Sequence, residues 1–216
     1  MLKVIFIYYC NLGGMGMVNG RNSNISIDKL IRFSKININD VYRILKTSIR
    51  GISNEEAELR RKKYGENKIE NSLKEIKEKK YYKVTREGAE ILVSVEYLTI
   101  GDVIHLNIGE YVPADVRIIH CNNLYISEYT LTGRDTLVKK HENIRGDYYL
   151  NKKITELDNI CLKGTEIVKG TALGIVIAIG NNTYYSKNKS LSNFIIKRKN
   201  KKGIIRIKDM IKLLEA

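Results

Sequence analysis

The amino-acid sequence predicts an α+β fold in which a small helical segment precedes a β-rich domain. Two observations predict it. Apolar residues between residues 39 and 65 recur at helical spacing between capping residues. From Tyr82 onward, short runs rich in β-branched and aromatic residues alternate with glycine, which is typical of strands and turns. Strands this short and this closely spaced predict a sandwich, a jelly roll or a distorted barrel. The 216 residues, 43% of them hydrophobic, suffice for one domain or two small ones.

Residues 1–38 show no clear period and contain four glycines, so we predict a loose leader. The first ten residues resemble a poor signal peptide, because a short apolar run follows Lys3. An extension ahead of a true start at Met15 or Met17 explains the same residues equally well.

Residues 39–80 are predicted to form the helical segment. Asn39 or Asp40 is expected to cap a first helix, which Gly51 ends. Ser53, followed by two acidic residues, is expected to cap a second helix that ends at Gly65. The remaining residues 66–80 are densely charged, which predicts a helix or a linker.

Residues 81–185 carry the strand pattern. We expect strands at Val84–Arg86, Ile91–Val95, Val103–Ile108, Val116–Cys121 and Leu124–Ile126, and a further group within Ile160–Ile179. Residues 134–159 interrupt them as a long polar excursion, which predicts a surface loop with one helical turn. The fold expected here is a distorted, jelly-roll-like β domain.

Residues 186–216 form a basic tail. The chain has a formal net charge of +14, and nine Lys or Arg residues without any acidic residue lie between Ser186 and Lys208. Such a segment suits nucleic acid or an anionic membrane surface, although a solvated tail in a lysine-rich composition explains it more simply. The stretch Ile204–Leu214 has the pattern of a terminal helix. No apolar run approaches the roughly 20 residues of a membrane-spanning helix, so no transmembrane segment is predicted.

Cysteines and histidines do not form a recognisable site. Cys10, Cys121 and Cys161 are odd in number and widely spaced, so neither a disulfide framework nor a zinc ribbon is indicated and an intracellular protein is favoured. The three histidines, His105, His120 and His141, lack the spacing of metal ligands. We therefore predict no metal site and no bound cofactor.

A series of short motifs identifies the strand-rich region. In order along the chain they are Gly101-Asp102-Val103-Ile104, Val112-Pro113-Ala114-Asp115, Leu131-Thr132-Gly133, Lys163-Gly164-Thr165 and Gly180 followed by Thr183. Their order and spacing resemble the actuator domain of P-type cation-transporting ATPases. Upstream, Gly51-Ile52-Ser53, Glu55-Glu56-Ala57 and Tyr64-Gly65 followed by Asn67 are similar to the amino-terminal segment of calcium and sodium/potassium pumps. The resemblance covers roughly residues 39–190.

The resemblance implies a catalytic loop that this chain has altered. Family members place a Thr-Gly-Glu loop on an aspartyl phosphate, where the glutamate activates the attacking water. Here the loop reads Thr132-Gly133-Arg134-Asp135. Arginine has no acceptor and stays protonated in proteins, so Arg134 cannot act as the base, although it can contact a phosphate. Asp135 is one position late, and its acting as a substitute base is the lesser alternative to degeneration.

The resemblance also implies parts that these 216 residues do not contain. The family's DKTGT phosphorylation segment does not occur in the sequence, and only about fifteen residues separate Asn67 from the first actuator strand, where family members carry two membrane helices. We therefore predict a truncated, degenerate pump relative, a pseudoenzyme without ATPase or pump activity.

Two alternative functions stay open. The chain can be a subunit or split-gene part that docks on a P-type ATPase, or a basic module that binds nucleic acid or an anionic membrane. The expected location is the cytoplasm, including the cytoplasmic face of a membrane.

Overall fold

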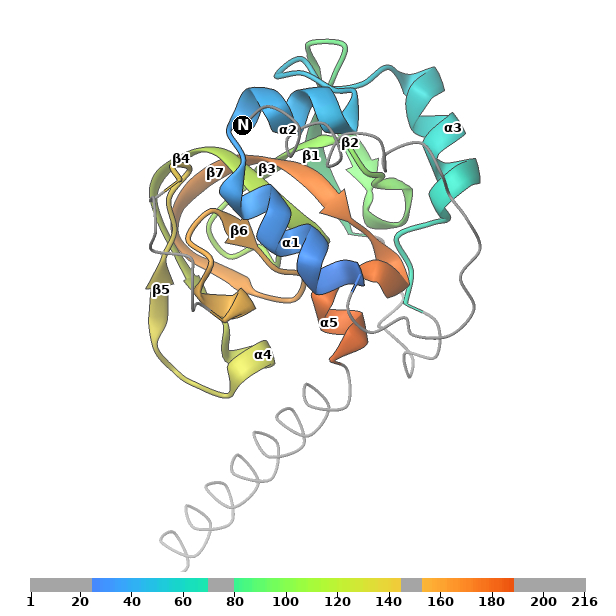
Figure 1. Ribbon diagram of the computed structural model, residues 1–216. Helices are drawn as coiled ribbons and strands as arrows, with labels where there is room; N and C mark the ends of the chain where they lie inside the picture. Colours follow the sequence, from blue (N-terminus) through green and yellow to red (C-terminus); the bar gives the residue numbers. More distant parts are fainter. Residues whose placement is uncertain (1–24, 70–79, 145–152, 189–216) are drawn as a thin grey trace, which may run out of the picture.

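The computed structural model describes residues 25–69, 80–144 and 153–188, and within these ranges the predicted α+β fold is confirmed. Seven antiparallel strands form one sheet with the order β2-β1-β3-β7-β4-β5, and β6 pairs with β4 (Figure 1). The strands are β1 (Tyr81–Arg86), β2 (Ala89–Ser94), β3 (Val103–Leu106), β4 (Asp115–Ser127), β5 (Leu137–Lys139), β6 (Ile160–Cys161) and β7 (Glu166–Ala178).

The long strands β4 and β7 form the centre of the sheet. The sequence predicted two strands at Val116–Cys121 and Leu124–Ile126, whereas the structure has one continuous β4. Its pairing with β7 shifts register at four places, and such bulges bend and twist a sheet. Gly174 permits a close approach of the two strands, because a Cβ there would collide with the Val116 side chain.

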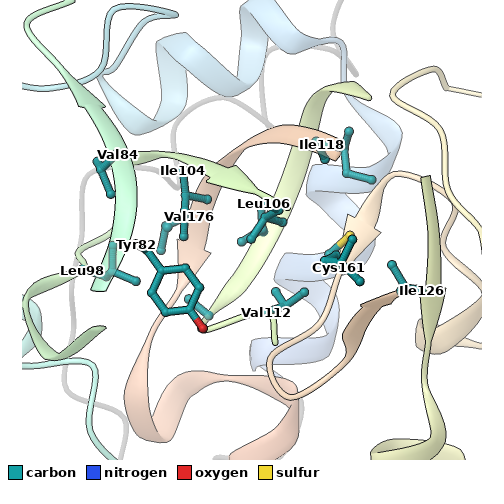
Figure 2. Close-up of a cluster of buried hydrophobic side chains, with 14 of the residues drawn as sticks. Tyr82, Val84, Leu98, Ile104, Leu106, Val112, Ile118, Ile126, Cys161 and Val176 are labelled. Carbon is teal, nitrogen blue, oxygen red and sulfur yellow. The ribbon is translucent and has the colours of Figure 1, made fainter. Parts of the chain in front are cut away.

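Alternate residues of the central strands face two separate hydrophobic cores. Ile104 and Val176 belong to a first core inside the curved sheet, where Figure 2 shows them with Val84, Leu106 and Ile118. Their neighbours Val103 and Ile175 face a second core, which the N-terminal helices cover. This is the two-residue alternation of a strand buried on both faces.

Helix α1 (Ile25–Lys35) lies within the region for which the sequence predicted a loose leader, and the prediction is corrected there. Its Leu30 and Phe33 are buried in the second core. Its last carbonyls are also bonded: Arg117 Nε donates to Phe33 O (3.0 Å) and Asn159 Nδ2 donates to Ser34 O (2.9 Å). The helix is thus held by residues far along the chain, whereas residues 1–24 lie outside the described part.

Helix α2 (Ile38–Leu45) has different caps from those expected. Asn37 Oδ1 accepts from Asp40 N (2.9 Å), so Asn37 is the N-cap and Asp40 lies in the first turn. The helix ends at Lys46, which takes the left-handed conformation with φ 48°, and not at Gly51. A cationic residue in this position suits the carbonyl end of a helix.

Helix α3 (Asn54–Tyr64) has the caps that the sequence predicted. Ser53 Oγ accepts from Glu56 N (3.1 Å), and Gly65 ends the helix with φ 81°. The buried Arg60 then connects this helix to its surroundings, because it donates to Ile100 O (2.9 Å) and Lys46 O (3.0 Å). The helical segment is therefore hydrogen-bonded to the β domain.

The segments on either side of residues 70–79 meet at one short turn, the 3-10 turn η2 (Val95–Tyr97). Asn67 N donates to Glu96 O (3.0 Å), and Val95 N donates to Lys80 O (2.9 Å). The buried Asn67 amide also donates to Val95 O and Pro113 O and accepts from Gly180 N (2.9 Å). Both segments are thus fixed to the β domain at neighbouring points.

The polar excursion at 134–159 contains β5 and the 3-10 turn η4 (Ile154–Glu156), with residues 145–152 outside the described part. After β7, the chain forms η5 (Gly180–Asn182) and a short helix α5 (Tyr184–Lys187). The terminal helix predicted at 204–214, and all of the basic tail beyond residue 188, also lie outside the described residues.

Candidate functional site

The predicted catalytic loop connects β4 to β5. Its first half is the single helical turn α4 (Tyr129–Thr132), which ends at Gly133 in the left-handed conformation (φ 69°). Glycine adopts this conformation without steric cost, and the Gly133 N–H closes the turn on Tyr129 O (2.8 Å). Thr132 Oγ1 donates to Glu128 O (3.0 Å) and accepts from Arg134 N (3.2 Å). The loop therefore has a defined shape up to Arg134.

The residues after the turn face solvent. Gly133, Arg134 and Asp135 are all exposed. A cleft of about 660 Å³ lies beside them. Thr132 and Arg134 line this cleft, whereas Asp135 does not. The four predicted site residues thus share one loop, but only two of them border the cleft.

A buried ion pair fixes the base of the loop. The Lys140 ammonium lies 2.9 Å from Glu128 Oε1, and the two side chains are 0% and 4% exposed. Lys140 Nζ also donates to Leu157 O (3.0 Å) and Thr155 O (3.4 Å). Burial raises the pKa of Glu128, while the charge and hydrogen bond of Lys140 act in the opposite direction. Because its carboxylate is bonded to Lys140, Glu128 is not available as a general base.

The sequence did not single out this pair. The one signal in the sequence was that Lys140 follows β5 directly and lies two residues after Val138, since residues two apart in an extended segment face the same side. A lysine that follows an apolar residue on an inward face needs a buried partner. The identity of that partner was not predictable, because Glu128 lies 12 residues earlier in the chain, on the other side of the loop.

The cleft contains charges of both signs. Besides Thr132 and Arg134 its lining includes the cation Lys153, the carboxylates Glu156 and Asp158, and Tyr184. Burial and the nearby Glu128 and Asp115 raise the pKa of the Tyr184 hydroxyl, so it stays neutral. The cleft can therefore hold a polar ligand or a polar protein surface.

Asp115 connects three segments behind the loop. Its carboxylate accepts from Lys163 N (2.9 Å) and from Tyr184 N (2.7 Å), the first residue of α5. Complete burial raises the pKa of Asp115 to about 6, although these two backbone donors and the charges of Lys163 and Lys29 lower it. Asp115 thus begins β4 and at the same time holds the start of α5.

Neither a metal centre nor a membrane span is found in the part of the chain that the structure describes. His105, His120 and His141 do not join other ligands there in a group of three or more that could hold a metal ion. Across residues 25–69, 80–144 and 153–188, every helix is too short or too polar to cross a bilayer.

Comparison with protein-family models gives two matches. The model for the P-type ATPase actuator domain matches residues 77–193, which is more than half of the chain. The model for the cation transporter/ATPase N-terminus matches residues 33–83. These ranges contain the β domain with its loop and the helical segment before it.

Individual relatives agree with these matches. The chain is 35% identical over 101 residues to a P-type magnesium-transporting ATPase of Escherichia coli. The matched stretch covers 47% of the chain and 11% of that protein. It is 30% identical over 132 residues to the sodium/potassium-transporting ATPase subunit alpha-B of Artemia franciscana, and this stretch covers 60% of the chain and 13% of that subunit. The sodium/potassium-transporting ATPase alpha subunit of Hydra vulgaris is 32% identical to the chain over 110 residues. The chain thus spans about a tenth of the length of the relatives it matches.

Proposed function

Because the chain belongs to the P-type ATPase family through its actuator domain, we propose that it is a degenerate member whose loop does not support dephosphorylation. The observation that carries the proposal is Arg134, which follows Thr132-Gly133 at the exposed end of α4 and lines the cleft. Activating a water molecule requires a group that accepts its proton, and a guanidinium does not. Asp135 is the next carboxylate along the chain, but it does not line the cleft.

Hydrolysis assays on the full chain test this proposal. ATP probes ATPase activity, and acetyl phosphate supplies the same acyl-phosphate bond as an aspartyl phosphate. We expect the release of phosphate from both to equal the rate in buffer. A rate above that of buffer which Asp135→Ala abolishes would show that Asp135 replaces the glutamate. As a control, Lys169→Ala alters an exposed lysine of β7 that does not line the cleft.

The proposal includes truncation relative to the pumps. A protein that works as the 216 residues alone runs at 24.8 kDa. An antibody against the β domain should detect this band in native cells, in the cytosol or at the cytoplasmic face of a membrane. A far larger band in the membrane fraction would instead show that the sequence is part of a whole pump, and that the activity has to be sought there.

A second candidate function is docking on a separate P-type ATPase. It is favoured by the contrast within the loop, whose base is held by the Glu128–Lys140 pair while Gly133, Arg134 and Asp135 face solvent. A rigid base with an exposed tip suits a contact surface. The chain should then co-purify with a membrane ATPase, and Arg134→Glu, which reverses the charge at the tip, should weaken that association. Recovery of a clean monomer from native extracts would argue against docking.

A further inference from the structure

A second hollow lies beside α4 and α5, which contribute Thr130 and Tyr185 to its lining. Its volume is about 360 Å³, and its lining includes Lys80, Tyr82, Tyr111, Pro113, Lys163 and Tyr185. Two residues of its lining are in direct contact, since Thr130 Oγ1 of α4 donates to Gly164 O (2.7 Å). Tyr184 borders the cleft and its neighbour Tyr185 borders this hollow.

Aromatic rings form much of the wall. The buried Tyr82 donates its hydroxyl to Tyr111 O (2.6 Å), which fixes its ring. Burial raises the pKa of Tyr82 to about 12, so the phenol remains neutral. The Tyr185 ring lies directly over Gly164, where an added Cβ would come within 3.1 Å of Cδ2. Tyrosine rings and a proline favour a flat aromatic ligand, because rings stack on one another in offset or edge-to-face geometry.

Among the described residues of the lining, the two charged ones are both cations. The Lys80 ammonium lies 5.6 Å from the centroid of the Tyr111 ring, and Lys163 Nζ lies 3.4 Å from Asn67 Oδ1. None of the described residues that line the hollow carries a carboxylate. Three acidic groups act on its members from outside the lining: Glu110 acts on Tyr82, Glu166 bonds Tyr111, and Asp115 attracts Lys163. The lining itself therefore favours an anion.

From these contacts we propose that the hollow binds a small aromatic anion, with its ring among the tyrosines and its acidic group at Lys80 and Lys163. Its volume lies near the lower end of the roughly 300–1,000 Å³ of ligand pockets, which suits a body of one or two rings. The proposal does not depend on the activity of the Thr132–Asp135 loop.

Fluorescence titration of the full chain tests this site with 8-anilinonaphthalene-1-sulfonate, an aryl sulfonate. The comparison probe is N-phenyl-1-naphthylamine, which has the same rings without the acid. We expect saturable binding of the sulfonate at one site per chain, tighter than that of the neutral amine and weakened by salt. Equal Kd values for the two probes, or binding that does not saturate, would overturn the proposal.

Variants locate the binding. Lys80→Gln and Lys163→Gln should each raise Kd by about 1.5- to 5-fold, the effect of losing one partly exposed charge interaction. Tyr111→Ala removes a wall residue that is 44% exposed, and should raise Kd further. Lys139→Gln and Lys169→Gln are matched controls, because these lysines lie beside the Tyr125 ring instead and should leave Kd unchanged.

The same dye binds partly folded chains, so each variant is first compared with wild type by circular dichroism and urea denaturation. A folded Lys80→Gln/Lys163→Gln chain with unchanged Kd would refute the site. If that variant loses structure, lysine acetylation of the wild-type chain decides instead. Saturating dye should protect Lys80 and Lys163 and leave Lys139 and Lys169 reactive, and equal labelling of all four would refute the site.

Discussion

Replacement of Lys140 by methionine should destabilise the protein strongly. The change removes the one cation that forms an ion pair with Glu128 among the described residues. It also removes the ammonium that donates to Leu157 O at 3.0 Å. Breaking one side of a buried pair typically costs about 3–5 kcal/mol, because an uncompensated charge stays inside. Removing both charges is far milder, so Lys140→Met/Glu128→Leu should be less destabilised than the sum of its single variants.

Urea denaturation followed by circular dichroism measures these free energies. At pH 7 the single variant should lose about 3–5 kcal/mol, and a double-mutant cycle should give a coupling of at least about 1 kcal/mol. The pH dependence has a definite sign. Without Lys140 the folded-state pKa of Glu128 rises further above its unfolded value, so the folded state binds the extra proton as pH falls. The deficit relative to wild type should therefore shrink between pH 7 and pH 5.

Two results would refute this reasoning. One is a loss below about 1 kcal/mol at pH 7, which would be the value of an exposed pair. The other is a double variant as unstable as the sum of both single variants, because the two charges would then not be coupled.

Three further changes test other parts of the fold by urea denaturation. Because α1 packs in the second core, Phe33→Ala should lower the free energy of unfolding by about 3–5 kcal/mol, whereas Arg32→Ala on the exposed side of α1 should change it by no more than about 0.5 kcal/mol. Equally small effects of both changes would show that α1 does not pack on the domain. Because the pKa of Asp115 is raised to about 6, wild type should lose stability as pH rises from about 4 to 6, by at most about 3 kcal/mol. Asp115→Asn should flatten that slope, and an unchanged slope would assign it to another group. Gly170→Ala and Gly109→Ala both place alanine at positive φ, but only the former collides with the Asn122 and Asn123 carbonyls, so it should cost about 1–3 kcal/mol more.

Features that depend on near neighbours were predictable from the sequence. Ser53 bonds the N–H three residues later, and Gly65 bonds the carbonyl four residues earlier, so both caps of α3 followed from local pattern. Most strands followed as well, because β-branched runs between glycines are a local signal. The exception is β5, which lies in the stretch where a surface loop was predicted. The α+β class was therefore predicted.

Features that depend on distant partners were not predictable. Helix α1 is a short amphipathic segment whose carbonyls are bonded by Arg117 and Asn159, which lie 84 and 125 residues away. The Asn67 amide likewise bonds Gly180 N, 113 residues away. In the loop, the sequence identified Arg134 from its position after Thr132-Gly133 but gave no partner for Lys140. Local pattern determines the elements, whereas their attachment to one another depends on contacts that only the folded chain brings together.

Asn67 and Lys80 are both bonded to the turn η2, and this arrangement affects how much inserted sequence the fold tolerates between them. Asn67 is bonded to Glu96, and Lys80 to the adjacent Val95, so the two flanks of residues 70–79 are held at neighbouring points independently of one another. A domain accepts inserted sequence most readily where both flanks are fixed and lie close together. We therefore expect the fold to tolerate sequence inserted between these two flanks, and a chain cut between Ile69 and Lys80 should reassemble from its two fragments.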